Sequence, residues 1–157
     1  MKLIKENYLF LILISLLFLI DRYSKIQILN LLEDKNYLFI NNFLNLNLVF
    51  NTGIGFGLFS LEAGIIYNLL STFILFIILV LLFFLLRSKT NEKIFFSLVI
   101  GGAIGNLYDR IIFKAVPDFI DFHIQDFHWF TFNIADIFIS IGIIFMILNE
   151  LLYNKKK

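Results

Sequence analysis

Two aspartates separated by 18 residues, Asp118 and Asp136, carry the most chemical information in this sequence. Asp118 follows one apolar segment and Asp136 lies in the first turn of the next, so antiparallel helices would bring both to the same depth. Two adjacent carboxylates cannot both ionise cheaply, and such a pair shares one proton. It can activate water while protonating a carbonyl or an amine, which is the aspartic mechanism of peptide hydrolysis. The helix dipole alone would favour Asp136, but it does not account for the second aspartate.

Other hydrolytic chemistries lack the residues that they need. The chain contains no Cys and no HExxH sequence, and none of its serines lies in a GxSxG context. Its two histidines, His123 and His128, fall in the connection between the last two apolar segments, and we interpret them as surface or interface residues rather than ligands. We therefore expect catalysis without a metal ion or a cofactor.

Several polar residues accompany the aspartates. Asn133 precedes Asp136 by three residues and points the same way on a helix. Asn106, Asp109 and Arg110 also share a helical face, at spacings of three and four. A structural pairing of Asp109 with Arg110 is the plainer interpretation, while the added amide and a neighbouring glycine patch favour a functional site.

A second group of residues is suited to support. Gly101 and Gly105 form a GxxxG pattern, which permits the close approach of another helix. Asp21 and Lys25 lie four residues apart on one helical face. They are interpreted as an internal salt bridge, with the alternative that Lys25 also orients a site at the outer face.

The elements that must position these residues are membrane helices. Of the 157 residues, 60% are hydrophobic and 16% charged, which excludes an ordinary soluble enzyme and a disordered chain. A net charge of +1 argues against nucleic-acid binding. The sequence predicts a single membrane domain over residues 1–157 whose four spans cover residues 8–29, 65–86, 94–113 and 134–153.

The distribution of positive charge predicts the orientation. Eight of the 13 Lys and Arg residues lie before the first segment, between the second and third, or after the fourth. The positive-inside rule then places both termini in the cytoplasm and the aspartate pair near the extracytoplasmic face.

The connection between the first two segments predicts a small sheet. Residues 44–48 alternate Leu and Asn, which is typical of a strand with one polar face, carrying Asn45, Asn47 and Asn51. Gly53 and the glycines after it end the strand. The predicted fold is an all-α membrane protein with a small extracytoplasmic β-sheet between helices 1 and 2.

Five sequence blocks resemble one known family. In order along the chain they are Asp21-Arg22-Tyr23-Ser24-Lys25, Asn51-Thr52-Gly53-Ile54-Gly55-Phe56-Gly57, Gly102-Ala103-Ile104-Gly105-Asn106-Leu107-Tyr108-Asp109-Arg110, Val116-Pro117-Asp118-Phe119-Ile120-Asp121-Phe122 and Phe132-Asn133-Ile134-Ala135-Asp136. Together, on a chain of this length, they resemble bacterial lipoprotein signal peptidase (signal peptidase II) over nearly the whole sequence.

The resemblance implies an intramembrane aspartic endopeptidase of the bacterial inner membrane. It would remove signal peptides from diacylglyceryl-modified prolipoproteins by cleaving before the lipidated cysteine. It implies that Asp118 and Asp136 are catalytic. The matching substrate-binding residues are Asn51, Asn106, Arg110 and Asn133, and the supporting residues are Asp21, Lys25, Gly53, Gly105 and Asp109. The expected partners are these prolipoproteins and membrane lipid, without an obligate protein partner.

Two other classes of function compete with this hypothesis. A small proton-coupled transporter could use Asp118 and Asp136 as a relay, but it predicts charges at mid-membrane and an internal repeat, and the sequence has neither. A purely structural assembly factor would have no reason to place two aspartates beside Asn133 and Arg110.

Overall fold

The computed structural model describes residues 2–53 and 64–154. The glycine block from residue 54 onwards and the lysines at 155–157, both used above, lie outside the described residues. The elements in chain order are α1 (Lys2–Leu31), β1 (Tyr37–Asn41), β2 (Leu44–Asn51), α2 (Ile65–Arg87), α3 (Thr90–Phe113), β3 (Val116–Ile124), β4 (Phe127–Phe132) and α4 (Ile134–Asn154).

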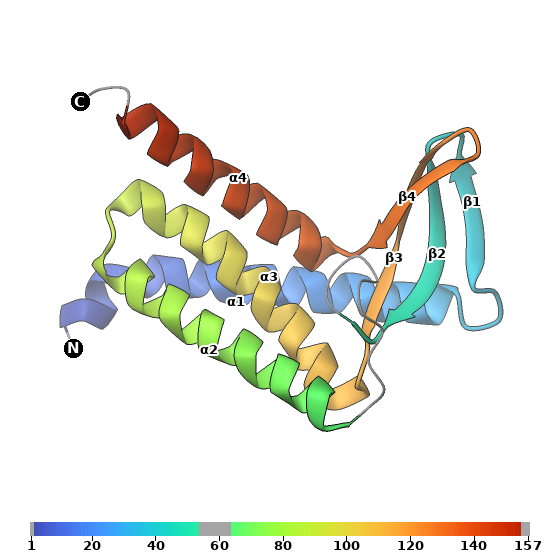
Figure 1. Ribbon diagram of the computed structural model, residues 1–157, viewed down its shortest axis with the longest axis horizontal. Coiled ribbons are helices and arrows are strands. Elements are labelled where there is room, and N and C mark those ends of the chain that lie inside the picture. The colour runs from blue at the N-terminus through green and yellow to red at the C-terminus, as the bar shows by residue number, and fades with distance from the viewer. Residues whose placement is uncertain (1, 54–63, 155–157) are drawn as a thin grey trace.

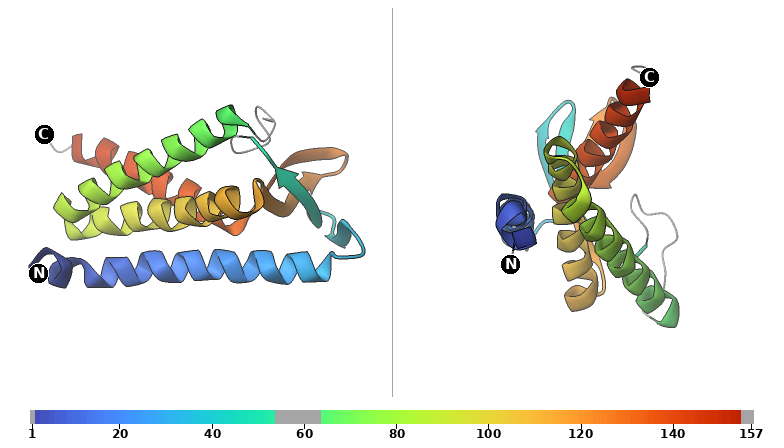
Figure 2. Two further views of the ribbon diagram at one scale, coloured as in Figure 1. Left: turned by 90° about the horizontal axis from the view of Figure 1, so that it is seen from below. Right: turned by 90° about the vertical axis from the view of Figure 1, so that its left-hand side faces the viewer.

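The four helices lie where the four apolar segments predicted them, and α3 contacts each of the other three. Figure 2 shows α1, α2 and α4 arranged around α3. Among the described helices, α2, α3 and α4 are long and apolar enough to cross a membrane. The helix α1 is not among them, so the count of four spans stays a prediction.

Glycines explain why α3 can be the central helix. A Cβ atom at Gly101 would lie 2.7 Å from the Leu17 Cβ of α1, and one at Gly105 would lie 2.5 Å from the Asp21 Oδ2. Gly102 faces α4, where a Cβ would lie 2.5 Å from the carbonyl oxygen of Ala135. The predicted close approach at the GxxxG pattern is therefore present against α1, and a third glycine serves α4.

The sheet has four antiparallel strands in the order β1-β2-β3-β4. Figure 1 shows it at one end of the bundle, opposite the start of α1 and the end of α4. The prediction of a sheet between the first two helices was wrong in part, because β3 and β4 come from the connection between α3 and α4. The first four residues of β3 are buried on both faces, so the first half of this strand lacks the alternation of apolar and polar residues that identified β2.

The register of the sheet decides which side chains share a face. The pairing shifts between β2 and β3 at Leu46/Val49, and again between β3 and β4 at Asp121/His123. The extra residue lies on β2 in the first shift and on β4 in the second. Strand β3 itself therefore has no bulge between Asp118 and Asp121. These two aspartates are three residues apart, and they therefore point to opposite faces of the sheet.

Candidate active site

Asp118 is held by two asparagine side chains. It lies on β3 and is 3% exposed. The Asn51 Nδ2 at the end of β2 donates to its Oδ2 at 2.9 Å, and the Asn133 Nδ2 donates to its Oδ1 at 2.5 Å. Both donors are neutral amides, so they orient the carboxyl without neutralising its charge.

Asn133 also joins Asp118 to the start of α4. Its Oδ1 accepts from the backbone N–H of Asp136 at 3.1 Å, while the Asp136 Oδ2 accepts from the backbone N–H of Asn133 at 3.1 Å. These two reciprocal hydrogen bonds form a capping box, with Asn133 directly before the helix and Asp136 three residues later. One asparagine therefore caps α4 through Asp136 and holds Asp118 with its remaining amide group.

The environment of Asp118 disfavours its charged form. Burial, and after it the negative charge of Asp136, raise the pKa of Asp118 to about 6. The hydrogen bonds from Asn51 and Asn133 act in the opposite direction. Asp118 is therefore the member of the pair suited to keep a proton in mildly acidic solution.

Asp136 is half-buried and is oriented through a relay that begins at Lys25. The Lys25 Nζ donates to the Asn106 Oδ1 at 3.0 Å, and the Asn106 Nδ2 donates to the Asp136 Oδ1 at 2.8 Å. An ammonium group can only donate hydrogen bonds, so it fixes the Asn106 amide with its oxygen inward. The amide nitrogen is then directed at the carboxylate of Asp136.

The charges around Lys25 are buried and paired. Its Nζ lies 2.8 Å from the Asp21 Oδ2 and 2.7 Å from the Asp109 Oδ2, and all three side chains are fully buried. The other Asp21 oxygen accepts from the backbone N–H of Ala135 at 3.0 Å. This network ties α1 to α3 and to the first turn of α4, directly before Asp136.

The alternative pairing of Asp109 with Arg110 is wrong. Asp109 bonds to Lys25 and to Arg22 instead. The Arg110 guanidinium donates to two backbone oxygens, that of Asn106 at 3.2 Å and that of Gly53 at 3.1 Å. The partner Arg22 was missed because a contact across 87 residues leaves no spacing signal in one sequence.

Arg110 and Asn51 both act on the backbone that follows β2. The Gly53 N–H donates to the Asn51 Oδ1 at 2.9 Å, and the Gly53 oxygen is the acceptor of the Arg110 contact. The predicted site residues of α1, β2, α3, β3 and α4 are thus brought together in one connected group. Whether Asn51, Asn106, Arg110 and Asn133 bind substrate stays a prediction.

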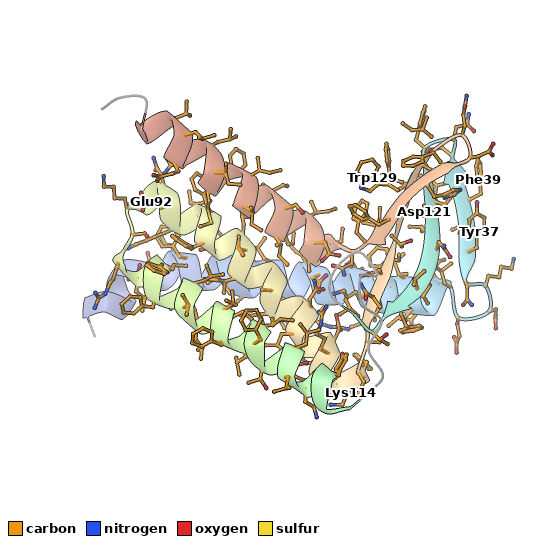
Figure 3. The ribbon with its side chains drawn as sticks, in the orientation of Figure 1. Tyr37, Phe39, Glu92, Lys114, Asp121 and Trp129 are labelled. Atoms are coloured by element: carbon orange, nitrogen blue, oxygen red, sulfur yellow. The ribbon has the colours of Figure 1, made fainter. Side chains whose placement is uncertain are left out.

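An apolar groove of about 440 Å³ lies beside Asp136. Its lining residues are Phe122, Trp129, Phe130, Phe132, Asp136, Ile137, Ser140 and Ile141. Figure 3 shows aromatic side chains of the β3–β4 hairpin, Trp129 among them, on the side of the sheet that faces α4. The groove therefore brings an apolar surface directly to one carboxyl of the pair.

A second polar group lies on the other face of β3 and was not predicted. The His128 Nδ1 lies 2.9 Å from the Asp121 Oδ2, and the Asn45 Nδ2 lies 3.3 Å from the same oxygen. His123 is 8% exposed, so it is buried rather than a surface residue as expected. The alternation of Asp121 and His123 along one strand was the available signal.

Asp118 on β3 and Asp136 at the start of α4 are joined through Asn133, beside helices that are apolar enough to span a membrane. These features indicate an integral membrane protein with a two-aspartate site. The sequence model of the family described as Signal peptidase (SPase) II matches residues 13–152. The chain belongs to this family and is a peptidase of the aspartic type.

The relatives cover the whole length of the chain. It is 48% identical to the lipoprotein signal peptidase of Pelagibacter ubique (strain HTCC1062), over 98% of this chain and 94% of that protein. It is 37% identical to that of Francisella tularensis subsp. mediasiatica (strain FSC147), over 99% of each. A solved structure described as a bacterial membrane enzyme superposes with a TM-score of 0.79 at 26% identity, over 94% of this chain and 90% of that one.

Proposed function

We propose that this peptidase removes signal peptides from diacylglyceryl-modified prolipoproteins, cleaving before the lipidated cysteine, with Asp118 and Asp136 as the catalytic pair. The observation that carries the proposal is the bridge made by Asn133, which joins the two carboxyl groups, one of which, that of Asp136, lines the apolar groove. The family membership supports the proposed reaction, and the bridge supports the choice of these two aspartates.

The surroundings of the two aspartates support different roles. Asp118 is buried and has a raised pKa, so it carries the proton and donates it to the carbonyl oxygen of the scissile bond. Asp136 lies half-buried in the first turn of α4, where it lines the groove. It takes a proton from the attacking water and later passes that proton to the leaving amine.

The groove suits the apolar parts of the substrate. Its aromatic and aliphatic lining offers a surface for the signal helix or for acyl chains, and Asp136 is one of two polar residues in that lining. Trp129 on the hairpin is the kind of residue that favours a membrane interface. The substrate would then reach the pair sideways, from the lipid.

The arrangement of the helices supports the predicted orientation. Strand β3, which carries Asp118, and the first turn of α4, which carries Asp136, lie at the sheet end of the bundle, away from the start of α1 and the end of α4 (Figure 1). With four spans and cytoplasmic termini, this end is extracytoplasmic in the bacterial inner membrane. A reporter fused after residue 157 should be active only in a cytoplasmic format, and a reporter active outside the cytoplasm would contradict the four-span topology.

The decisive test is cleavage by the purified protein of a prolipoprotein in two forms, with and without diacylglyceryl on its cysteine. We expect a product that begins at the cysteine from the lipidated form only, and none from the Asp136→Asn variant. Cleavage of both forms at equal rates would contradict the assigned substrate. Wild-type cleavage that persists in the Asp136→Asn variant would contradict the assigned pair.

A further inference from the structure

We propose that Asp121, His123 and His128 form a binding site for a divalent transition-metal ion, with zinc as the best-suited ion. Each of the three residues offers a ligand atom, and these atoms all lie within 4.8 Å of one another. Two imidazole nitrogens and one carboxylate oxygen form a ligand set that suits zinc, with Zn–N and Zn–O distances of about 2.0–2.2 Å. The site is separate from the catalytic pair and goes beyond the proposed function.

The strands bring the ligands together by simple register. Asp121 and His123 are two residues apart on β3 and therefore share a face, and His128 on β4 is the direct cross-strand partner of His123. The two imidazole rings are nearly parallel, with 5.0 Å between their centroids. Because the Asp118 side chain points to the opposite face of β3, a metal ion here would not touch the scissile bond.

The hydrogen bonds of the three ligands would rearrange when an ion binds, because they engage the same nitrogen and oxygen atoms. The Asn45 Nδ2 lies 3.2 Å from the His123 Nδ1, and because an amide nitrogen only donates, the lone pair of this Nδ1 faces Asn45 and would turn to the ion on binding. The His128 Nδ1 lies within 3.0 Å of both Asp121 oxygens. When the ion binds, the proton of His128 resides on its Nε2, and Nδ1 joins the carboxylate as a ligand.

Asn45 completes the site as the residue that orients a ligand. It is 2% exposed, and its Nδ2 donates to the Asp121 Oδ2, as groups behind a metal-bound carboxylate commonly do. Its Oδ1 is buried and has no hydrogen-bond partner among the residues that the structure describes.

Binding of the ion should hold the two strands of the β3–β4 hairpin together. The ion would link β3 to β4, and through Asn45 to β2, on the sheet that carries Phe130 and Phe132 of the apolar groove. Figure 3 shows Asp121 among the strands of the sheet at the end of the molecule away from Glu92. Binding should therefore raise the stability of the folded protein without being needed for peptide cleavage.

The test is zinc titration of the full chain in detergent micelles, purified with an affinity tag that contains no histidine and stripped with a chelator. We expect one zinc ion per chain, and at least a 100-fold weaker affinity in His128→Gln and Asp121→Asn. His128 is half exposed, so its replacement should not prevent folding. Cobalt should give the visible absorption of a tetrahedral site in the wild type and lose it in both variants.

Two matched variants locate the ion. Asp126→Asn removes an acid from the same hairpin outside the ligand set, and it should bind zinc like the wild type. Asp136→Asn tests whether the catalytic pair is the binding site, and it should also retain affinity. Unchanged binding in His128→Gln, loss of binding in Asp136→Asn, or a wild type that binds no zinc would each overturn the proposal.

Discussion

Asp118 and Asp121 lie three residues apart on one strand, yet they meet different chemistry. Asp118 faces the start of α4, where neutral amides hold it beside a second carboxyl group. Asp121 faces the other side of the sheet, where an imidazole and a third amide hold it. The first setting raises the pKa of a carboxyl group and leaves it a proton to give, while the second supplies a basic partner. The two aspartates therefore differ in their surroundings because their side chains lie on opposite faces of the sheet.

The largest effect should come from the catalytic pair. We expect Asp118→Asn and Asp136→Asn each to lower the rate of prolipoprotein cleavage by about 10²–10⁴-fold, the usual worth of a positioned acid or base. The double variant should be hardly slower than either single one, because the two carboxyl groups act as a unit. The measurement is the cleavage rate at matched protein levels. Strictly multiplicative losses would show that the two residues work independently.

The next effect concerns stability. Lys25→Met leaves Asp21 and Asp109 buried with one cation fewer, and it should lower the free energy of unfolding by about 3–5 kcal/mol. His128→Gln removes a half-exposed partner of Asp121 and should cost less than about 1 kcal/mol. Denaturant unfolding in detergent, with both variants free of metal, compares them. Equal losses of unfolding free energy in the two variants would contradict a larger contribution of the buried Lys25 ion pairs than of the half-exposed His128 contact.

A pH profile tests the state of Asp118. The proposed mechanism needs a protonated Asp118, and its surroundings raise the pKa of this carboxyl group to about 6, so kcat/KM should fall as the pH rises through about 6. Asn51→Ala removes a hydrogen bond that lowers this pKa, so the fall should move to higher pH. The matched control is Asn45→Ala, on the same strand beside Asp121, which should leave the midpoint in place. A midpoint that moves in neither variant would place the proton on another group.

The sequence predicted the helices and the close approach of Asp118 and Asp136, now seen in their shared bonds to Asn133, because each leaves a local signal. Apolar runs reveal the helices, and two aspartates at matching ends of antiparallel helices reveal the pair. The β3–β4 hairpin was missed because β3 begins buried on both faces, which removes the alternation that identifies a strand. Arg22 and the partners of Asp121 were missed for another reason. The contact of Arg22 with Asp109 follows from the packing of α1 against α3, and the contacts of Asp121 follow from the register of the sheet.

Asp121→Asn should have the smallest effect on catalysis, although it lies three residues from Asp118. Its side chain points away from Asn133 and Asp136, and asparagine keeps an oxygen that can accept from His128. We expect cleavage within about threefold of the wild type, since a substitution away from the reacting atoms removes no acid or base. The same variant should lose its zinc affinity, so one substitution separates the two faces of the strand. An inactive Asp121→Asn beside an active Asp118→Asn would show that the catalytic acid is the other aspartate of this strand.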